Sequence, residues 1–244
     1  MTLFIGERMQ NLMRGVHAQW HPLLHEALSH MNGDYLQQLQ STPENWLPDK
    51  NKLFASFSLP LASTRFILLG ESPYPRAQSA NGYAFWDNSV ESLWSKTGLS
   101  KEVNRATSLR NLLKMLLHAR GDLSTDFSQP AISELDKSAY VQTAKQLFEA
   151  LIQQGFLLLN ATLIYSENEV NYHARQWRPF MHSLLIQLAS YNPSLQLILF
   201  GRIAELIPEA NLFTSLRAEH PYNISFITNP NVLTFFKPLD LLAL

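Results

Sequence analysis

The sequence predicts an α/β protein of three layers, in which helices cover a doubly wound, mainly parallel sheet of four strands. Short apolar runs of strand length alternate along the chain with longer segments whose apolar residues recur at helical spacing. The first of these runs is continuously apolar and ends at a glycine, which is typical of a parallel strand buried on both faces. The order of strands and helices therefore favours this fold class.

Length, charge and composition set the limits for this fold. The chain has 244 residues, a net charge of −1 and no cysteine. No linker, repeat or low-complexity tract divides it, so we expect one domain over residues 1–244, of which residues 1–60 form a mainly helical part. The lack of cysteine excludes disulfides, thiolate metal sites and iron–sulfur clusters. No apolar run approaches about 18 residues and no signal-peptide pattern is present, so we expect a cytoplasmic protein.

The first 60 residues predict a helical scaffold. Apolar residues recur at helical spacing through residues 7–40, including Leu12, Met13 and Trp20. Residues 41–60 contain Pro43 and Pro48 and are typical of a loop. They lead into the first buried strand, which we expect over residues 65–69.

A rigid polar turn follows this strand, where residues 70–75 read Gly-Glu-Ser-Pro-Tyr-Pro. The two prolines fix their own φ angles and favour extended conformations at Ser72 and Tyr74. Glu71, Ser72 and Tyr74 should therefore project from the carboxyl end of the strand, where open α/β sheets bind their ligands. The alternative is an ordinary proline-rich loop that leaves a core strand.

The next long helix has an N-terminus that suits a phosphate. Its leucines form one apolar face, whereas Arg110, Lys114 and His118 recur at every fourth position on another face. Ser108 or Thr107 is the expected N-cap. Hydroxyl groups and free N–H groups at a helix start, with Arg105 nearby, can bind a phosphate. The alternative is an ordinary cap and a solvated basic face.

A second helix, expected over residues 144–154, ends at Gly155 and leads to a second buried strand with Asn160 at its carboxyl end. The amide of Asn160 can donate to a carbonyl and accept from an imide N–H, which matches the edge of uracil and not that of neutral cytosine. The alternative is that Asn160 is only a turn residue.

The last third of the chain completes the alternation. We expect a helix over residues 178–191, a third strand over residues 195–200 ending at Gly201, and a short helix through Ala204 and Leu206. A fourth strand over residues 214–218 then leads to a segment that contains His220, Tyr222 and Ile224.

These motifs together resemble the uracil-DNA glycosylases, most closely their family 1. That family's first motif reads Gly-Gln-Asp-Pro-Tyr-His and ends in Gly-Leu-Ala-Phe, where this chain has residues 70–75 and Gly-Tyr-Ala-Phe at residues 82–85. The resemblance also covers residues 35–39, 108–111, 157–160, 173–177, 199–201 and 220–221. It implies a monomeric DNA repair enzyme that hydrolyses the N-glycosidic bond of deoxyuridine in DNA and releases uracil, without a metal or another cofactor. It leaves room for a protein inhibitor or a replication partner.

The resemblance also implies roles for single residues. Tyr74 closes the space that the methyl group of thymine would occupy, Phe85 stacks on the flipped uracil, and Asn160 reads the edge of the base. His220 donates to uracil O2 as negative charge builds on the leaving base. The residues expected to contact DNA are Ser108, Thr107, Arg105, Tyr222 and Ile224, with Ile224 as the apolar wedge.

Two departures from the family pattern affect the mechanism. The family's water-activating aspartate is Ser72 here, and a neutral hydroxyl can neither accept a proton near pH 7 nor stabilise a sugar cation by charge. Our hypothesis is that Glu71, at the place of a functional glutamate in the family 4 and family X enzymes, replaces it. The family's Ser-Pro after the His-Pro motif is Tyr222-Asn223. The alternatives are a relative that binds DNA, uracil or a protein without cleavage, and an enzyme for another damaged base or a free nucleoside.

Overall fold

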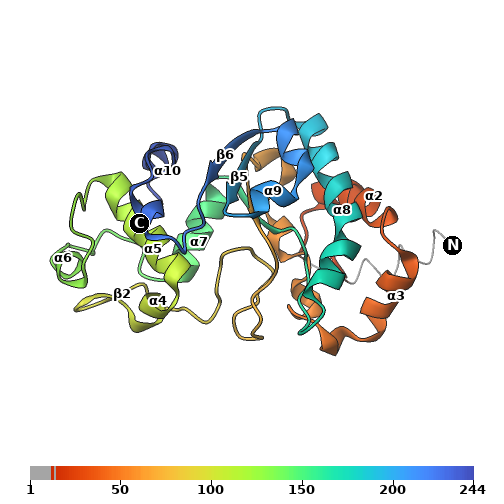
Figure 1. The fold of residues 1–244 in the computed structure, drawn as a ribbon, viewed down its shortest axis with the longest axis horizontal. Helices are drawn as coiled ribbons and strands as arrows, with labels where there is room; N and C mark the ends of the chain where they lie inside the picture. The colour runs from red at the N-terminus through yellow and green to blue at the C-terminus, as the bar shows by residue number, and fades with distance from the viewer. Residues whose placement is uncertain (1–11, 14) are drawn as a thin grey trace. The chain divides into compact units, whose positions relative to one another are not determined.

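The computed structural model describes residues 12, 13 and 15–244 of the chain (Figure 1). The predicted helical positions among residues 7–11 lie outside the described residues. The chain divides into two compact units. The expectation of a single domain over residues 1–244 stays a prediction. The first unit comprises Met1–Asp87, Gly155–Ile198 and Ile207–Ser215, and the second comprises Asn88–Gln154, Leu199–Leu206 and Leu216–Leu244.

The predicted α/β fold with a parallel four-stranded sheet flanked by helices is confirmed. The strand order is β4-β1-β5-β6. Every residue of β1 and β4 is buried, whereas the edge strand β6 is half-buried or exposed, which explains why its sequence is more polar. The strands are β1 (Phe66–Gly70), β4 (Phe156–Asn160), β5 (Gln196–Phe200) and β6 (Thr214–Ala218).

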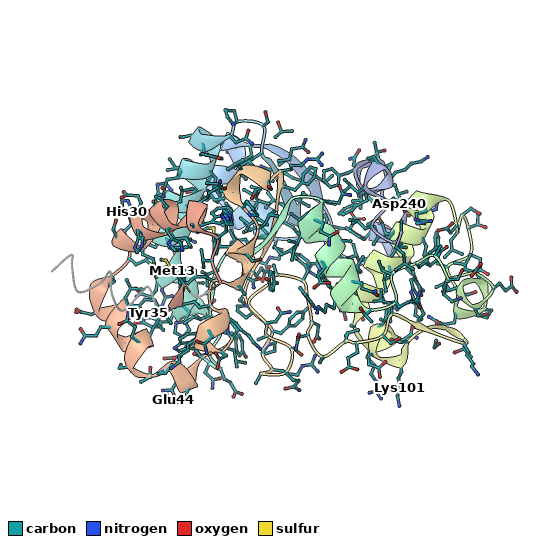
Figure 2. The ribbon with its side chains drawn as sticks, turned by 180° about the vertical axis from the view of Figure 1, so that it is seen from behind. Met13, His30, Tyr35, Glu44, Lys101 and Asp240 are labelled. Carbon is teal, nitrogen blue, oxygen red and sulfur yellow. The ribbon has the colours of Figure 1, made fainter. Side chains whose placement is uncertain are left out.

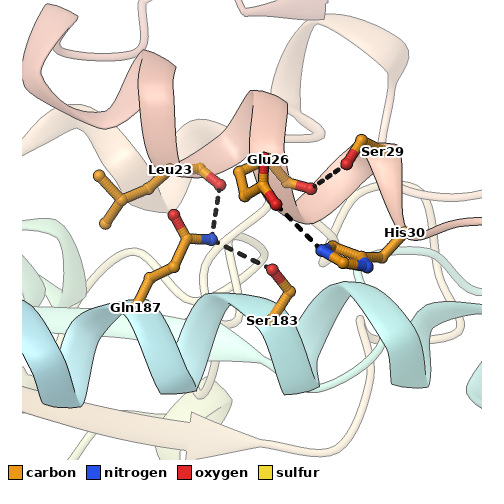
Figure 3. A network of polar contacts seen from close by, with 6 residues as sticks. All are labelled: Leu23, Glu26, Ser29, His30, Ser183 and Gln187. Carbon is orange, nitrogen blue, oxygen red and sulfur yellow. Dashed lines mark hydrogen bonds and ion pairs between the residues drawn. The ribbon is translucent and has the colours of Figure 1, made fainter.

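The first unit also holds helices α2 (His21–Ser29), α3 (Gly33–Ser41) and α8 (Val170–Tyr191). Helices α2 and α8 pack together, and Gln187 Nε2 of α8 donates to the carbonyl of Leu23 in α2 at 3.2 Å (Figure 3). The predicted start of α8 near residue 178 was wrong, because Pro179 lies inside the helix and not in its first turn.

The N-terminal part of the first unit has a buried interior. Met13 and Tyr35, both labelled in Figure 2, are almost inaccessible to solvent. The segment predicted as a loop instead contains short 3-10 helices, and its aromatic residues Phe54 and Phe57 are buried in the core. These helices are Pro43–Asn45, Lys50–Lys52 and Ala55–Ser58, and Leu61–Ser63 follows them.

The second unit is built around helix α5 (Thr107–Arg120), which packs on the 3-10 helix Ile224–Thr228. Helix α5 begins at Thr107 with Ala106 as its N-cap, so the prediction that Ser108 or Thr107 caps it was wrong. A small antiparallel hairpin, which the sequence analysis did not predict, pairs β2 (Trp94–Ser95) with β3 (Gly98–Leu99). The remaining helices are α4 (Lys101–Arg105), α6 (Gln129–Ser133), α7 (Ala144–Gln153), α9 (Ile203–Leu206) and α10 (Pro230–Phe236).

The predicted helix over residues 144–154 is α7, and its start has a clear local cause. Thr143 and Gln146 form a capping box, in which each side chain bonds to the other residue's main chain. None of the helices in the described part of the chain is long and apolar enough to cross a membrane.

Candidate active site

In the first unit, strands β1 and β4 end side by side at Gly70 and Asn160, which are partners in the parallel register. The backbone pairing continues past the strands, because Ala161 N donates to Gly70 O at 2.8 Å and Thr162 N donates to Glu71 O at 3.0 Å. These two hydrogen bonds fix the main chain of Glu71 relative to Asn160.

Gly70 lies at the bottom of a close-packed group of side chains. A Cβ atom added at this position would lie 2.6 Å from Asn160 Oδ1, 3.0 Å from Ala84 Cβ and 3.6 Å from Phe85 Cε2. The segment that carries Ala84 is tied to β4, since Ala84 N donates to Leu158 O at 3.0 Å. Only glycine at position 70 lets the amide of Asn160 and the ring of Phe85 approach the strand so closely.

Phe85 has an unusual backbone conformation, with φ at 65°. A bulky residue in this left-handed region is strained by about 1–3 kcal/mol and persists only where its surroundings impose it. At the start of the same motif, Gly82 has φ at 89°, and a Cβ atom there would lie 2.0 Å from Lys52 O. The position of the Phe85 ring is therefore set by the backbone as well as by its neighbours.

Tyr74 is hydrogen-bonded to Phe85, because its hydroxyl donates to the Phe85 carbonyl at 3.2 Å. Burial raises the pKa of Tyr74 to about 12, with a further contribution from the Asp87 carboxylate that Arg76 partly offsets. Asp87 itself is buried and paired with Arg76 at 3.0 Å. Tyr74 is thus a neutral donor at physiological pH. Of the predicted base-pocket residues, Phe85 and Asn160 lie together at Gly70, and Tyr74 is hydrogen-bonded to Phe85.

The amide of Asn160 has no hydrogen bond to any residue that the structure describes, although its side chain is only 4% exposed. Neither polar atom of this amide is among the fully buried, unpaired polar atoms of the described residues, so the amide is open to a polar group beside the Phe85 ring. Within the motif that follows β1, Glu71 is exposed and Ser72 is half-buried. Neither side chain has a polar partner among the described residues.

His220 belongs to the second unit, where it follows β6. Tyr222 N donates to His220 Nδ1 at 3.1 Å, so this nitrogen is an acceptor and the proton of the neutral ring is on Nε2. The backbone of Gly201 lies close to the His220 side chain, since a Cβ atom added at position 201 would lie 2.9 Å from His220 Cβ. This close approach explains the glycine that ends the predicted third strand.

The residues predicted to contact DNA also lie in the second unit. Thr107 and Ser108 occupy the first turn of α5 and are half-buried, and Arg105 just before them is exposed. Arg110 is turned back to the main chain, since its Nη1 donates to Asn104 O at 2.9 Å. Burial lowers the pKa of Lys114, and the charge of Arg110 lowers it further, against an opposing effect of Asp126.

The segment after His220 exposes two large apolar side chains. Tyr222 is 68% exposed and Ile224 is 80% exposed. Asn111, which is buried in α5, donates from Nδ2 to the Pro221 carbonyl at 2.7 Å. Asn111 ends the family-like segment at residues 108–111, and no role was predicted for it. The sequence does carry a signal for such a role, because an asparagine interrupts the leucine-rich buried surface of α5.

Comparisons with known proteins agree with this geometry. The crystal structure of the uracil-DNA glycosylase (UNG) from Nitratifractor salsuginis is 42% identical to the chain and matches it with a TM-score of 0.92 over 97% of both chains. A uracil-DNA glycosylase of Helicobacter pylori is 30% identical over 78% of this chain and 74% of its own length. Mimivirus uracil-DNA glycosylase, at 20% identity and a TM-score of 0.59 over 86% and 71% of the two chains, supports the fold alone. No family model matches the chain.

The sheet, with Gly70 and Asn160 paired at the carboxyl ends of β1 and β4, defines an α/β protein whose polar residues gather at that edge of the sheet. The chain belongs to the uracil-DNA glycosylase family, whose members are hydrolases of N-glycosyl bonds that act in base excision repair. The predictions of family, fold and enzyme class are thereby confirmed.

Proposed function

We propose that this chain binds uracil-containing DNA and releases uracil, with Glu71 as the carboxylate of the reaction. The observation that carries the proposal is the position of the Asn160 amide, which lies at the carboxyl end of β4 beside the Phe85 ring and makes no hydrogen bond with a described residue. This amide can donate to a uracil carbonyl and accept from the N3–H of the base. Stacking on Phe85 would add about 1–3 kcal/mol.

The chemistry needs a carboxylate, and Glu71 is the candidate in this motif. Hydrolysis breaks the bond between C1′ and N1, the base leaves with the electron pair, and water adds to C1′ with loss of a proton. A carboxylate near the sugar orients that water and stabilises the oxocarbenium-like transition state. Glu71 is exposed, its main chain is bonded to Thr162, and no described residue pairs with its side chain. Ser72 at most positions the water.

The second requirement is a group that stabilises the negative charge on the leaving base. Because His220 Nδ1 accepts from Tyr222 N, Nε2 is the ring nitrogen that can carry a proton and donate it in a hydrogen bond to uracil O2 as negative charge develops there. A donor aimed at developing charge contributes on the order of 3 kcal/mol to transition-state stabilisation. We assign phosphate contacts to Arg105, Thr107 and Ser108, and contacts with the bases to Tyr222 and Ile224.

One observation favours a second candidate function, binding without cleavage. The pocket lies on the side of the strand to which a side chain at Gly70 would point. Ser72, which stands where the family has its aspartate, is half-buried, whereas Glu71 is exposed. A site that presents only Ser72 to the sugar would bind the base and leave the bond intact.

Uracil release from a single-stranded deoxyuridine oligonucleotide separates the two functions. We expect release by the native protein, and losses of about 100-fold or more in Glu71→Gln and Asn160→Ala, because each removes a group that acts directly on the substrate. Ser72→Ala should change the rate little. The matched control is Glu44→Gln, which makes the same chemical change at an exposed residue labelled in Figure 2.

The result against this proposal is equally specific. No release by the native protein, with release gained in Ser72→Asp, would mean that the pocket binds the base and lacks its water activator. Full activity in Glu71→Gln would exclude Glu71 as the carboxylate.

A further inference from the structure

In the second unit, the segment after His220 curls around one buried amide. Asn111 of α5 is 3% exposed, and its Nδ2 lies 2.7 Å from Pro221 O, 3.4 Å from Tyr222 O and 3.5 Å from Asn223 O. An amide has two N–H groups, so the first contact is a strong hydrogen bond and the other two are long ones. Three successive carbonyl groups therefore point inward to a single nitrogen.

The N–H groups of the same segment also point inward. Tyr222 N donates to His220 Nδ1 at 3.1 Å, and Asn223 N donates to His220 O at 2.9 Å. With the backbone polar groups turned toward Asn111 and His220, the side chains of Tyr222 and Ile224 face solvent. Their exposure thus follows from an ordered turn. Large apolar side chains that are held outward in this way mark a contact surface.

Helix α5 connects this segment to the proposed phosphate contacts. Asn111 lies four residues after Thr107 and three after Ser108, so the three side chains share one face of the helix. The axial distance from Ser108 to Asn111 is about 4.5 Å, from the rise of an α-helix. A single rigid element therefore sets the spacing between the phosphate contacts and the exposed segment.

We propose that Asn111 is a positioning residue that makes Tyr222 and Ile224 a two-residue wedge, in which Tyr222 stacks on a base next to the target nucleotide. This inference rests on the proposed function, since it requires that the segment contacts DNA. An aromatic ring stacks on any base, and an apolar side chain can fill the space that a flipped base leaves. The wedge acts on the opening of a base stack, which a duplex requires more than a short single strand does.

The test compares kcat/KM for deoxyuridine in a duplex with kcat/KM for deoxyuridine in a short single strand. We expect Asn111→Ala, Tyr222→Ala and Ile224→Ala each to lower the duplex value by about tenfold and the single-strand value by less than about threefold. Tyr222→Phe keeps the ring and should retain the native ratio. Asn160→Ala changes the pocket, so it should lower both values by the same factor.

A double-mutant cycle shows whether Asn111 acts through the wedge. In the background Tyr222→Ala with Ile224→Ala, the change Asn111→Ala should have little further effect on the duplex value. The control for simple destabilisation is Leu113→Ala, because Leu113 is fully buried and lies about 200° around α5 from Asn111. It should lower the melting temperature and leave the duplex to single-strand ratio unchanged.

Two results would contradict the proposed wedge and leave the proposed function intact. One is an unchanged ratio in Tyr222→Ala, and the other is a full, independent loss from Asn111→Ala in the double-variant background. Failure of the proposed function looks different, because the native protein would then release no uracil from either DNA. In that case the binding of both DNAs, measured by fluorescence anisotropy, still tests the wedge through the duplex affinity of Tyr222→Ala.

Discussion

The base pocket of the first unit and the segment after His220 in the second unit are held in different ways. The pocket depends on close backbone approach at Gly70 and on a strained backbone at Phe85, which has φ at 65°. The exposed segment depends on hydrogen bonds from Asn111 and to His220. Asn160 in the pocket is 4% exposed, whereas Ile224 in the segment is 80% exposed.

From this difference we expect substitutions in only one of the two regions to change folding stability and activity together. A steric pocket cannot be altered without disturbing its packing, so its substitutions should lower activity and folding stability together. The exposed segment contributes little packing, so its substitutions should affect DNA handling with small effects on stability.

The largest effect is expected from Gly70→Ala. The added Cβ atom would lie 2.6 Å from Asn160 Oδ1, so the amide or the strand must move. We expect uracil release to fall by about 100-fold or more and the free energy of unfolding to fall by about 1–3 kcal/mol. Release assays and urea unfolding measure the two effects. Gly33→Ala is the control, since no atom lies within 4 Å of its added Cβ, and normal activity in Gly70→Ala would contradict the steric pocket.

Two variants of Phe85 separate the effect of its stacking ring from the effect of its strained backbone. Phe85→Ala and Phe85→Gly both remove the stacking ring and should lower kcat/KM by about 10- to 100-fold. Because φ at position 85 is 65°, a conformation that glycine adopts freely, the glycine variant should have a free energy of unfolding about 1 kcal/mol higher than the alanine variant. Urea unfolding of the pair measures this difference. Equal stabilities would mean that the backbone relaxes when the ring is removed.

Much of the sheet could be predicted because its signals are local. The apolar runs of β1 and β4 predicted two buried strands, and their last residues Gly70 and Asn160 were predicted to lie at the carboxyl ends. The structure pairs these two residues directly. The same local signal placed Glu71, Ser72 and Asn160 at this edge of the sheet, whereas the pocket roles of Tyr74 and Phe85 came from the family resemblance and stay predictions.

The features that sequence analysis missed depend on distant contacts. The N-cap of α5 was misplaced because helix α4 ends at Arg105, directly before Ala106, so that the turn between the two helices decides where α5 starts. The positive φ of Phe85 and the close approach of Ala84 to Gly70 exist only once the chain has folded. Asn111 bonds to a carbonyl 110 residues away, a contact that local spacing could not reveal.

Gly201→Ala tests whether the second unit also relies on a steric contact. The added Cβ atom would lie 2.9 Å from His220 Cβ, and φ at position 201 is 77°, so the His220 ring should shift. We expect kcat to fall by about tenfold with KM nearly unchanged, because His220 acts on charge that develops only in the transition state. Steady-state kinetics measures both constants. A change in KM alone would place the role of His220 in base binding and weaken the contrast between the two regions.

The smallest effect is expected from Tyr74→Phe, which removes the hydroxyl that donates to the Phe85 carbonyl at 3.2 Å. At pH 7 this should lower the free energy of unfolding by about 1 kcal/mol. Burial raises the pKa of Tyr74 from 10.0 to about 12 in the folded protein. The unfolded chain therefore loses this proton first, and the folded state loses stability as the pH rises from 10 to 12.

The same variant should reduce that alkaline loss of stability. One pKa unit corresponds to about 1.4 kcal/mol, so native protein should lose about 2 kcal/mol through Tyr74 over this interval, a contribution that Tyr74→Phe lacks. Burial likewise raises the pKa of Tyr140 to about 12, so the variant should retain part of the dependence. Urea unfolding at several pH values between 9 and 12 would measure both slopes. Equal slopes would mean that the Tyr74 hydroxyl is open to solvent, and that the pocket is less closed around Phe85 than its packing indicates.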